Sequence, residues 1–235
     1  MTSAKNTAGL LLVAVPLVFT AGFTGLQMTF DYPDILRHPG GGVLTRFAAA
    51  GADLHLYWYA MMAAALGMIP ATVAAGLHFW KRDNLLASLG MAFGALAGLV
   101  QALGLIRWVI LVPGLAATYV APGAADADKA MAVSIFDATN LYLGLGVGEH
   151  LGYLFTGVWT LLVSSLLFSD RRILSLSGFA LSLGVMAGML EPYGVPMAAT
   201  INAIAYSLWA LWTLILGVTL LVEGRTVRIP TAQAA

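Results

Sequence analysis

The sequence predicts an all-α fold, a polytopic membrane helical bundle of six transmembrane helices with short outer amphipathic segments. Composition is the first reason: 60% of the 235 residues are hydrophobic, only 9% are charged, and the mean hydropathy is +0.88. A soluble domain has about a quarter of its residues charged. The second reason is that long apolar runs, each near the ~20 residues that span a bilayer, alternate with charged or Pro- and Gly-containing turns. Residues 1–235 are therefore expected to form a single integral membrane domain.

Each span is placed by its apolar length and by the polar residues that bound it. The first run follows Lys5 and is longer than the roughly 7 to 15 hydrophobic residues of a signal peptide, so we expect a retained helix. The third run exceeds one crossing, and we place its far interface at Arg107-Trp108, followed by a kink near Pro113. The predicted spans are Ala8–Met28, Leu54–Trp80, Leu85–Ile106, a run that starts near Glu149 and ends at Phe168, Ile173–Leu190 and Met197–Val222.

Two polar interruptions are predicted to lie at the outer surface, at about residues 31–50 and 121–140. Within the first, Val43, Leu44 and Phe47 fall on one side at helical spacing. This pattern predicts a short amphipathic helix that lies on the membrane. The second contains APGAADADK and is predicted to begin as a surface loop.

The distribution of basic residues predicts the orientation. Seven lie on the side of the termini and four on the other: Lys5, Lys81, Arg82, Arg171, Arg172, Arg225 and Arg228 against Arg37, Arg46, Arg107 and Lys129. Cytoplasmic loops carry the excess of Lys and Arg, so both termini are predicted to be cytoplasmic.

Glycines spaced four apart predict close contacts between helices. One such seam lies in the third span and the other in the fourth: Gly90, Gly94 and Gly98, then Gly144, Gly148 and Gly152. At helical spacing the members of each seam share one face, which lets a neighbouring backbone approach. Beside the second seam runs a polar stripe of Glu149, Tyr153, Thr156, Thr160 and Ser164.

Polar groups gather at the predicted outer side, and we expect them to form a ligand site under the loop between the first two spans. The predicted ligand-binding residues are Arg107, Asp137, Asn140, Glu149, His150, Tyr153 and Glu191. Burying a charge in the bilayer is costly, so a buried one would be paired, and Arg107 could neutralise Asp137 or Glu149. Simpler readings stay open: the Glu149-His150 pair caps a helix start at the interface, and Arg107 extends to the headgroups. Likewise, Tyr57, Trp58, Tyr59 and Trp108 fit an interfacial aromatic belt.

Metal and haem sites are alternatives that rest on histidines. His38, His55 and His150, with Asp53 or Glu149, have the chemistry of a zinc or copper site. A single haem between His55 and His150 is the other alternative. A two-haem conduit is not expected, because His78 is the one histidine predicted for the inner side. No cofactor is predicted, and the absence of cysteine excludes thiolate ligands and disulfides.

Three functional classes follow. The preferred one is a small-molecule or ion binding or transport protein with a polar site in the outer half of the bundle. The second is a structural or accessory subunit that packs against a partner membrane subunit or another copy of itself, and the third is a metal or haem protein. No phosphate loop, nucleotide fingerprint, zincin motif or nucleophile elbow is present, so the prediction leans away from an enzyme. Zero net charge gives no reason to expect nucleic acid.

Several short motifs resemble those of a known family. They are FDYPDILR, the following Val43-Leu44, the aromatic Tyr57-Trp58-Tyr59, and Arg107-Trp108 with Pro113. Together they resemble a family of uncharacterised bacterial multi-pass membrane proteins, defined as a domain of unknown function. The resemblance implies a helical bundle in a bacterial inner membrane and brings no catalytic residues.

Overall fold

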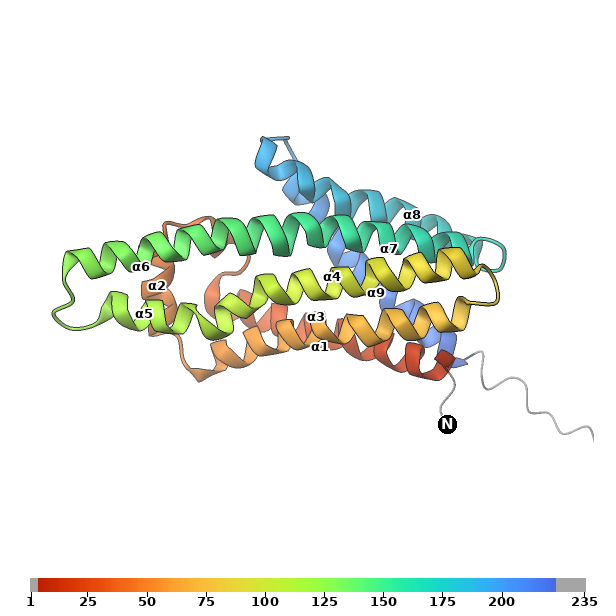
Figure 1. The fold of residues 1–235 in the computed structure, drawn as a ribbon, viewed down its shortest axis with the longest axis horizontal. Helices are drawn as coiled ribbons and strands as arrows, with labels where there is room; N and C mark the ends of the chain where they lie inside the picture. Colours follow the sequence, from red (N-terminus) through yellow and green to blue (C-terminus); the bar gives the residue numbers. More distant parts are fainter. Residues whose placement is uncertain (1–3, 223–235) are drawn as a thin grey trace, which may run out of the picture.

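The computed structural model describes residues 4–222, and every regular element within that range is a helix (Figure 1). Residues 1–3 and the tail from residue 223, which carries Arg225 and Arg228, lie outside the described range. The elements in chain order are α1 (Ala4–Phe30), η1 (Asp34–Arg37), α2 (Gly40–Ala49), α3 (Ala52–Phe79), α4 (Asn84–Ile110), α5 (Val112–Val120), α6 (Asp126–Thr139), η2 (Asn140–Leu151), α7 (Gly152–Leu167), α8 (Arg172–Ala187), η3 (Gly188–Tyr193) and α9 (Ala198–Val222).

Six helical stretches of the described chain are long and apolar enough to cross a membrane, as predicted. They form a ring in which the neighbours are α1 and α3, α3 and α4, α4 and α7, α7 and α8, α8 and α9, and finally α9 and α1. The start of α1, the end of α9 and the turns at 80–83 and 168–171 lie at one end of the bundle, here called the terminal end (Figure 1). The fold class is confirmed, whereas the cytoplasmic location of the terminal end stays a prediction.

Local sequence signals explain where several helices start and stop. Asp83 caps α4, since its Oδ1 accepts hydrogen bonds from the backbone N–H groups of Leu85 and Leu86, both at 2.9 Å. Such a cap satisfies donors that have no partner within the helix. At the other end of the bundle, η3 stops at Gly194, whose φ of 72° is a left-handed conformation that glycine adopts without strain.

The buried side chains form two cores. The core at the terminal end is built around Trp159, Trp209 and Trp212, which pack edge to face. The other, which we call the cap core, is built around Trp58 and Trp108, whose rings stack with centroids 4.5 Å apart. The predicted interfacial belt is therefore wrong for this pair, because Trp58 and Trp108 are only 0% and 1% exposed.

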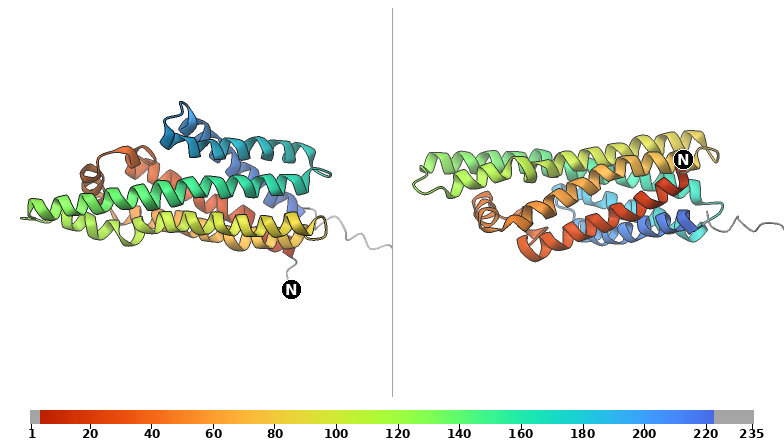
Figure 2. Two further views of the ribbon diagram at one scale, coloured as in Figure 1. Left: turned by 45° about the horizontal axis from the view of Figure 1, so that its top comes forward. Right: turned by 90° about the horizontal axis from the view of Figure 1, so that it is seen from below.

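One long helix corrects two sequence predictions. Only residues 121–125 form the predicted surface loop, and the chain from Asp126 to Leu167 is one continuous helical stretch of 42 residues. At 1.5 Å per residue it is about 60 Å long, twice the ~30 Å hydrocarbon core. Glu149 consequently lies midway along a helix and does not start one. With α5, α6 forms a hairpin that projects beyond the rest of the bundle (Figure 2), held by the burial of Ala132 and Phe136 in the cap core.

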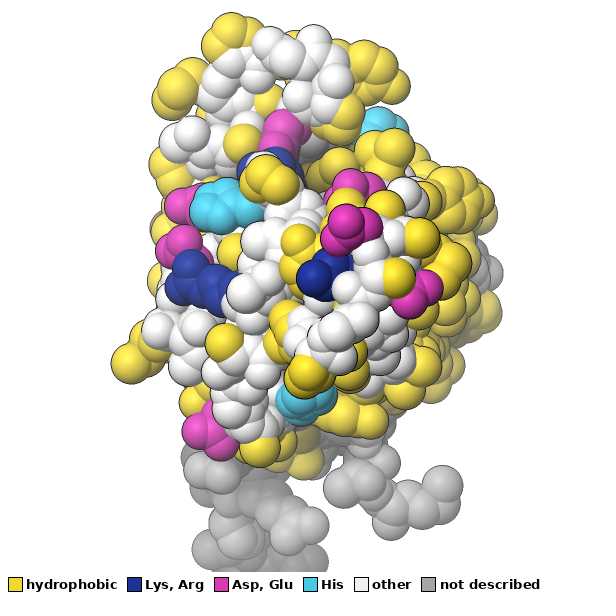
Figure 3. Space-filling view, turned by 90° about the vertical axis from the view of Figure 1, so that its left-hand side faces the viewer, with side chains coloured by type: hydrophobic (Ala, Val, Ile, Leu, Met, Phe, Trp, Pro, Cys, Tyr) yellow, Lys and Arg dark blue, Asp and Glu magenta, His cyan; other side chains and the backbone are white. Residues whose placement is uncertain are grey.

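The predicted amphipathic helix exists as α2, but its apolar face is covered by other helices of the protein. Val43, Leu44 and Phe47 form its buried face, and they pack against the α5–α6 hairpin in the cap core. Arg107 lies in the last turn of α4, which ends at Ile110, and the helix breaks at Leu111, close to the predicted kink. Figure 3 looks onto this end and shows charged and histidine side chains gathered there, with hydrophobic side chains on the flanks.

Candidate ligand-binding cavity

A cavity of about 460 Å³ lies between the two cores, inside the ring of helices. Its volume is within the range of small-molecule sites, about 300 to 1,000 Å³. Its wall is mainly aromatic and aliphatic, and most of its polar side chains come from α1, α4 and α9. The lining residues are Phe19, Thr20, Phe23, Gln27, Tyr32, Pro33, Leu36, Trp58, Met61, Gln101, Gly104, Leu105, Arg107, Trp108, Gly144, Gly148, Glu149, Tyr153, Asn202, Ala203, Tyr206, Ser207 and Ala210.

Arg107 is the one buried charged side chain in the part of the chain that the structure describes, and it lines the cavity with 5% exposure. Its Nη1 donates to the Gly104 carbonyl oxygen, and its Nη2 donates to Asn140 Oδ1 at 3.0 Å. The guanidinium also lies 5.2 Å from the Trp108 ring centroid, a cation–π contact. Within residues 4–222 its Nε has no hydrogen-bond partner, and no carboxylate forms an ion pair with it. Neither predicted reading of Arg107, extended to the headgroups or paired with Asp137 or Glu149, is correct.

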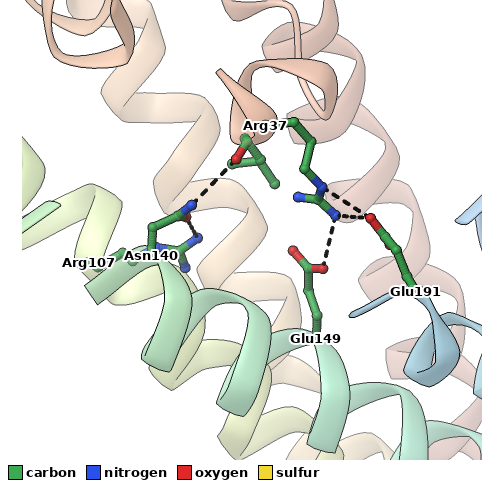
Figure 4. A network of polar contacts seen from close by, with 6 residues as sticks. Arg37, Arg107, Asn140, Glu149 and Glu191 are labelled. Carbon is green, nitrogen blue, oxygen red and sulfur yellow. Dashed lines mark hydrogen bonds and ion pairs between the residues drawn. The ribbon is translucent and has the colours of Figure 1, made fainter. Parts of the chain in front are cut away.

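Asn140 connects Arg107 to the turn that covers the cavity. Its side-chain oxygen accepts from Arg107, and its Nδ2 donates to the Leu36 carbonyl oxygen at 3.4 Å (Figure 4). The amide therefore orients the guanidinium from one side and holds η1 from the other.

Arg37 forms ion pairs with the carboxylates of both Glu191 and Glu149. Its Nε and Nη2 donate to Glu191 Oε1 at 3.1 and 2.6 Å, and its Nη2 lies 3.5 Å from Glu149 Oε2 (Figure 4). Partial burial alone would lower the pKa of Arg37, but the charges of Glu149 and Glu191 outweigh it and raise that pKa. The contact joins η1 to η2 and η3, three segments that are far apart in the chain.

The remaining predicted site residues divide into two groups. Tyr153 lines the main cavity and, with Glu149, His150 and Glu191, also lines an adjoining cavity of about 170 Å³. Asp137 lines neither; it is exposed, and its carboxylate contacts Gly40 at the start of α2. The structure thus brings six of the seven predicted residues to two adjoining cavities or their immediate contacts, and leaves Asp137 apart.

Several residues that line or close the cavity were not predicted from the sequence. Arg37 was considered only for orientation, although its place in FDYPDILR, a charged segment between two spans, was a usable signal. Gln101 donates from Nε2 to Thr156 Oγ1 at 3.1 Å, and that hydroxyl lies 3.3 Å from the Tyr206 hydroxyl. Burial, and then the charge of Glu149, raises the pKa of Tyr32, so this lining hydroxyl stays neutral and can donate a hydrogen bond.

The glycine seam of the fourth span explains how Arg107 fits. Gly144 and Gly148 lie on η2, a π-helix, a rare geometry often found at functional sites. Gly152 begins α7, and all three glycines face α4. A Cβ atom at Gly144 would lie 2.6 Å from Arg107 Nη2, and one at Gly104 would lie 2.7 Å from the Gly148 Cα. Side chains at these positions would therefore displace Arg107 or separate the two helices.

The three histidines proposed for metal do not meet. Within residues 4–222, no group of three or more His, Cys, Asp or Glu side chains is placed to hold a metal ion. His38 follows η1, His55 stacks against Phe47 with ring centroids 5.3 Å apart, and His150 lines the smaller cavity. The predicted His38–His55–His150 site is therefore not formed in this structure, because each side chain belongs to a different local environment.

Six long apolar helices around an internal cavity define a multi-pass membrane protein. The chain belongs to the family described as "Domain of unknown function (DUF4386)", whose pattern it matches over residues 7–224. Comparison with curated proteins and with solved structures found no match.

Proposed function

We propose that this protein binds a small organic anion in the cavity, with Arg107 as the partner of the anionic group. The observation that carries the proposal is a buried guanidinium that lines a 460 Å³ cavity and has no carboxylate partner among the described residues. A guanidinium cannot be deprotonated in proteins, and a buried charge without a counter-charge is costly. An anionic ligand group would supply that counter-charge.

The arrangement of donors supports a carboxylate or phosphate. Arginine presents five N–H groups in a planar fork that matches such oxyanions, and two of its nitrogens already hold Gly104 and Asn140. The Nε of Arg107 and the indole N–H of Trp58 are both buried without a hydrogen-bond partner in the described chain, and both residues line the cavity. The aromatic wall would then hold the apolar body of the ligand.

Binding to the protein reconstituted in lipid nanodiscs tests the proposal. Radiolabelled naphthoate and dodecanoate are expected to bind, whereas naphthylmethanol and dodecanol should compete weakly. Arg107→Gln should weaken anion binding by about 2 kcal/mol or more, a factor of about 30. Arg46→Gln is the matched control, because Arg46 is exposed and pairs with Asp31 outside the cavity.

Two further variants keep the test decisive if Arg107→Gln folds poorly. Arg107→Lys keeps the charge but loses the fork, so it should retain part of the affinity for anions. Gly144→Ala keeps the Arg107 side chain itself, but the added methyl group would displace its Nη2. This variant should therefore also weaken anion binding. Equal affinity for anions and their alcohol analogues in wild-type protein would refute the proposal.

A further inference from the structure

Helices α1 and α9 touch at the terminal end and diverge at the cavity. At the terminal end, a Cβ on Gly217 of α9 would lie 2.9 Å from the Gly9 carbonyl oxygen of α1. In the half of the bundle that contains the cavity, α1 packs instead against α3, and α9 packs against α8. A Cβ on Gly22 of α1 would lie 3.0 Å from the Tyr57 oxygen of α3, and one on Gly184 of α8 would lie 2.6 Å from Ala205 of α9.

The divergence leaves an opening in the wall of the cavity. Thr20 and Gln27 on α1, and Ala203 and Ser207 on α9, line the cavity and are at the same time exposed. Residues that are both lining and exposed mark the places where the cavity reaches the surface. These four lie on the two helices, and the fifth such residue, Pro33, lies in the turn that follows α1. The small or polar side chains of the four helical residues leave a passage with hydrogen-bonding groups along its edge.

The surface around this opening is apolar. On α1, Leu17 is 55% exposed, and on α9, Ile204 and Leu208 are 58% and 49% exposed. Both helices are candidate membrane spans, so these side chains face hydrocarbon. The opening therefore faces lipid and not bulk water.

We propose that the opening between α1 and α9 is a lateral portal, through which a single-chain anionic amphiphile passes from the bilayer to Arg107. This inference rests on the proposed function and adds the ligand class and its route. The headgroup, a carboxylate or a phosphate monoester, lies at the guanidinium. The single chain extends along Phe19, Phe23 and Met61 toward the portal, where it meets the hydrocarbon of the membrane without crossing an aqueous phase.

Tryptophan plugs in the portal provide the test, in nanodiscs and with dodecanoate as the probe. Ser207→Trp and Ala203→Trp place a large ring in the passage at exposed positions, so folding should be retained. Leu208→Trp is the matched control, since it adds the same ring to the neighbouring lipid-facing position. Stopped-flow kinetics should show association slower by about tenfold in both plug variants, with the association rate of the control equal to that of wild type.

The outcomes separate the portal from the proposed function. Unchanged rates in both plug variants, while dodecanoate still binds through Arg107, would overturn the portal and leave the anion site standing. If the wild-type protein binds neither naphthoate nor dodecanoate, the anion site itself is refuted.

Competition between dodecanoate and dodecanoyl lysophosphatidate distinguishes the two possible sources of the amphiphile, a free fatty acid and a lysophospholipid. Tighter binding of dodecanoate assigns a free fatty acid, and tighter binding of the phosphate assigns a lysophospholipid; either result supports the proposed class. Retained naphthoate binding with no measurable affinity for either amphiphile would overturn it.

Discussion

The two glycines Gly90 and Gly94 lie one turn apart on α4 and should respond to the same substitution in opposite directions. A Cβ on Gly94 would lie 2.5 Å from Thr72 Cβ of α3 and 2.7 Å from Trp159 Cδ1 of α7, whereas a Cβ on Gly90 would have no neighbour within 4 Å. At Gly94 the new methyl group meets two helices at once, and overpacking of this kind costs about 1 to 3 kcal/mol. At Gly90 alanine should stabilise the helix by about 0.5 to 1 kcal/mol.

Equilibrium unfolding of Gly94→Ala and Gly90→Ala in mixed micelles with increasing denaturing detergent measures this difference. The free energy of unfolding should be lower for Gly94→Ala than for Gly90→Ala by about 1.5 to 4 kcal/mol, the sum of the two effects. Helix content by circular dichroism should match wild type in both. Equal stability of the two variants would show that α3, α4 and α7 do not approach as closely as described.

Three further predictions concern hydrogen bonding, topology and pH. Thr160→Val removes the acceptor of a buried indole N–H bond of 2.8 Å, and should lower the free energy of unfolding by about 0.6 to 1.7 kcal/mol, measured as above. Single cysteines at Asp126 and Asp170 in this cysteine-free chain should be labelled from opposite sides of the membrane, Asp126 from outside; labelling of both from one side would contradict six crossings. A hydrogen bond from Ser169, then the charge of Arg82, lowers the pKa of Asp170, so its contribution is present above about pH 4 and lost as pH falls further. Asp170→Asn should therefore make the melting temperature less sensitive to pH below that value.

Most of the fold could be predicted because membrane spans are determined by local composition. Six apolar runs and the glycine seam at Gly144, Gly148 and Gly152 needed no knowledge of tertiary contacts. The exceptions were residues whose setting depends on distant segments. Residues 126–139 are too polar to be recognised as part of a span, yet they continue the helix because Phe136 is buried against α2 and α5.

The site shows the same division. Arg107, Glu149 and Tyr153 were recognisable as polar groups in apolar surroundings, but their pairing was not. Sequence position left Asp137 or Glu149 open as a partner of Arg107, whereas the η1 turn brings Arg37 to Glu149. That arrangement depends on how a loop between two spans folds over the bundle, and no local pattern in the sequence encodes it.

Photoaffinity labelling tests most directly whether an anionic headgroup lies at Arg107. Nanodisc-embedded protein is irradiated with dodecanoate that carries a diazirine next to its carboxylate, and the labelled residues are mapped by peptide mass spectrometry. Labels are expected on cavity residues of α4 and η2 around Gly104, Arg107 and Gly148. Labelling should be lost on competition with naphthoate and in Arg107→Gln but kept in Arg46→Gln. Labels confined to lipid-facing residues such as Leu183 of α8, and insensitive to naphthoate, would contradict it.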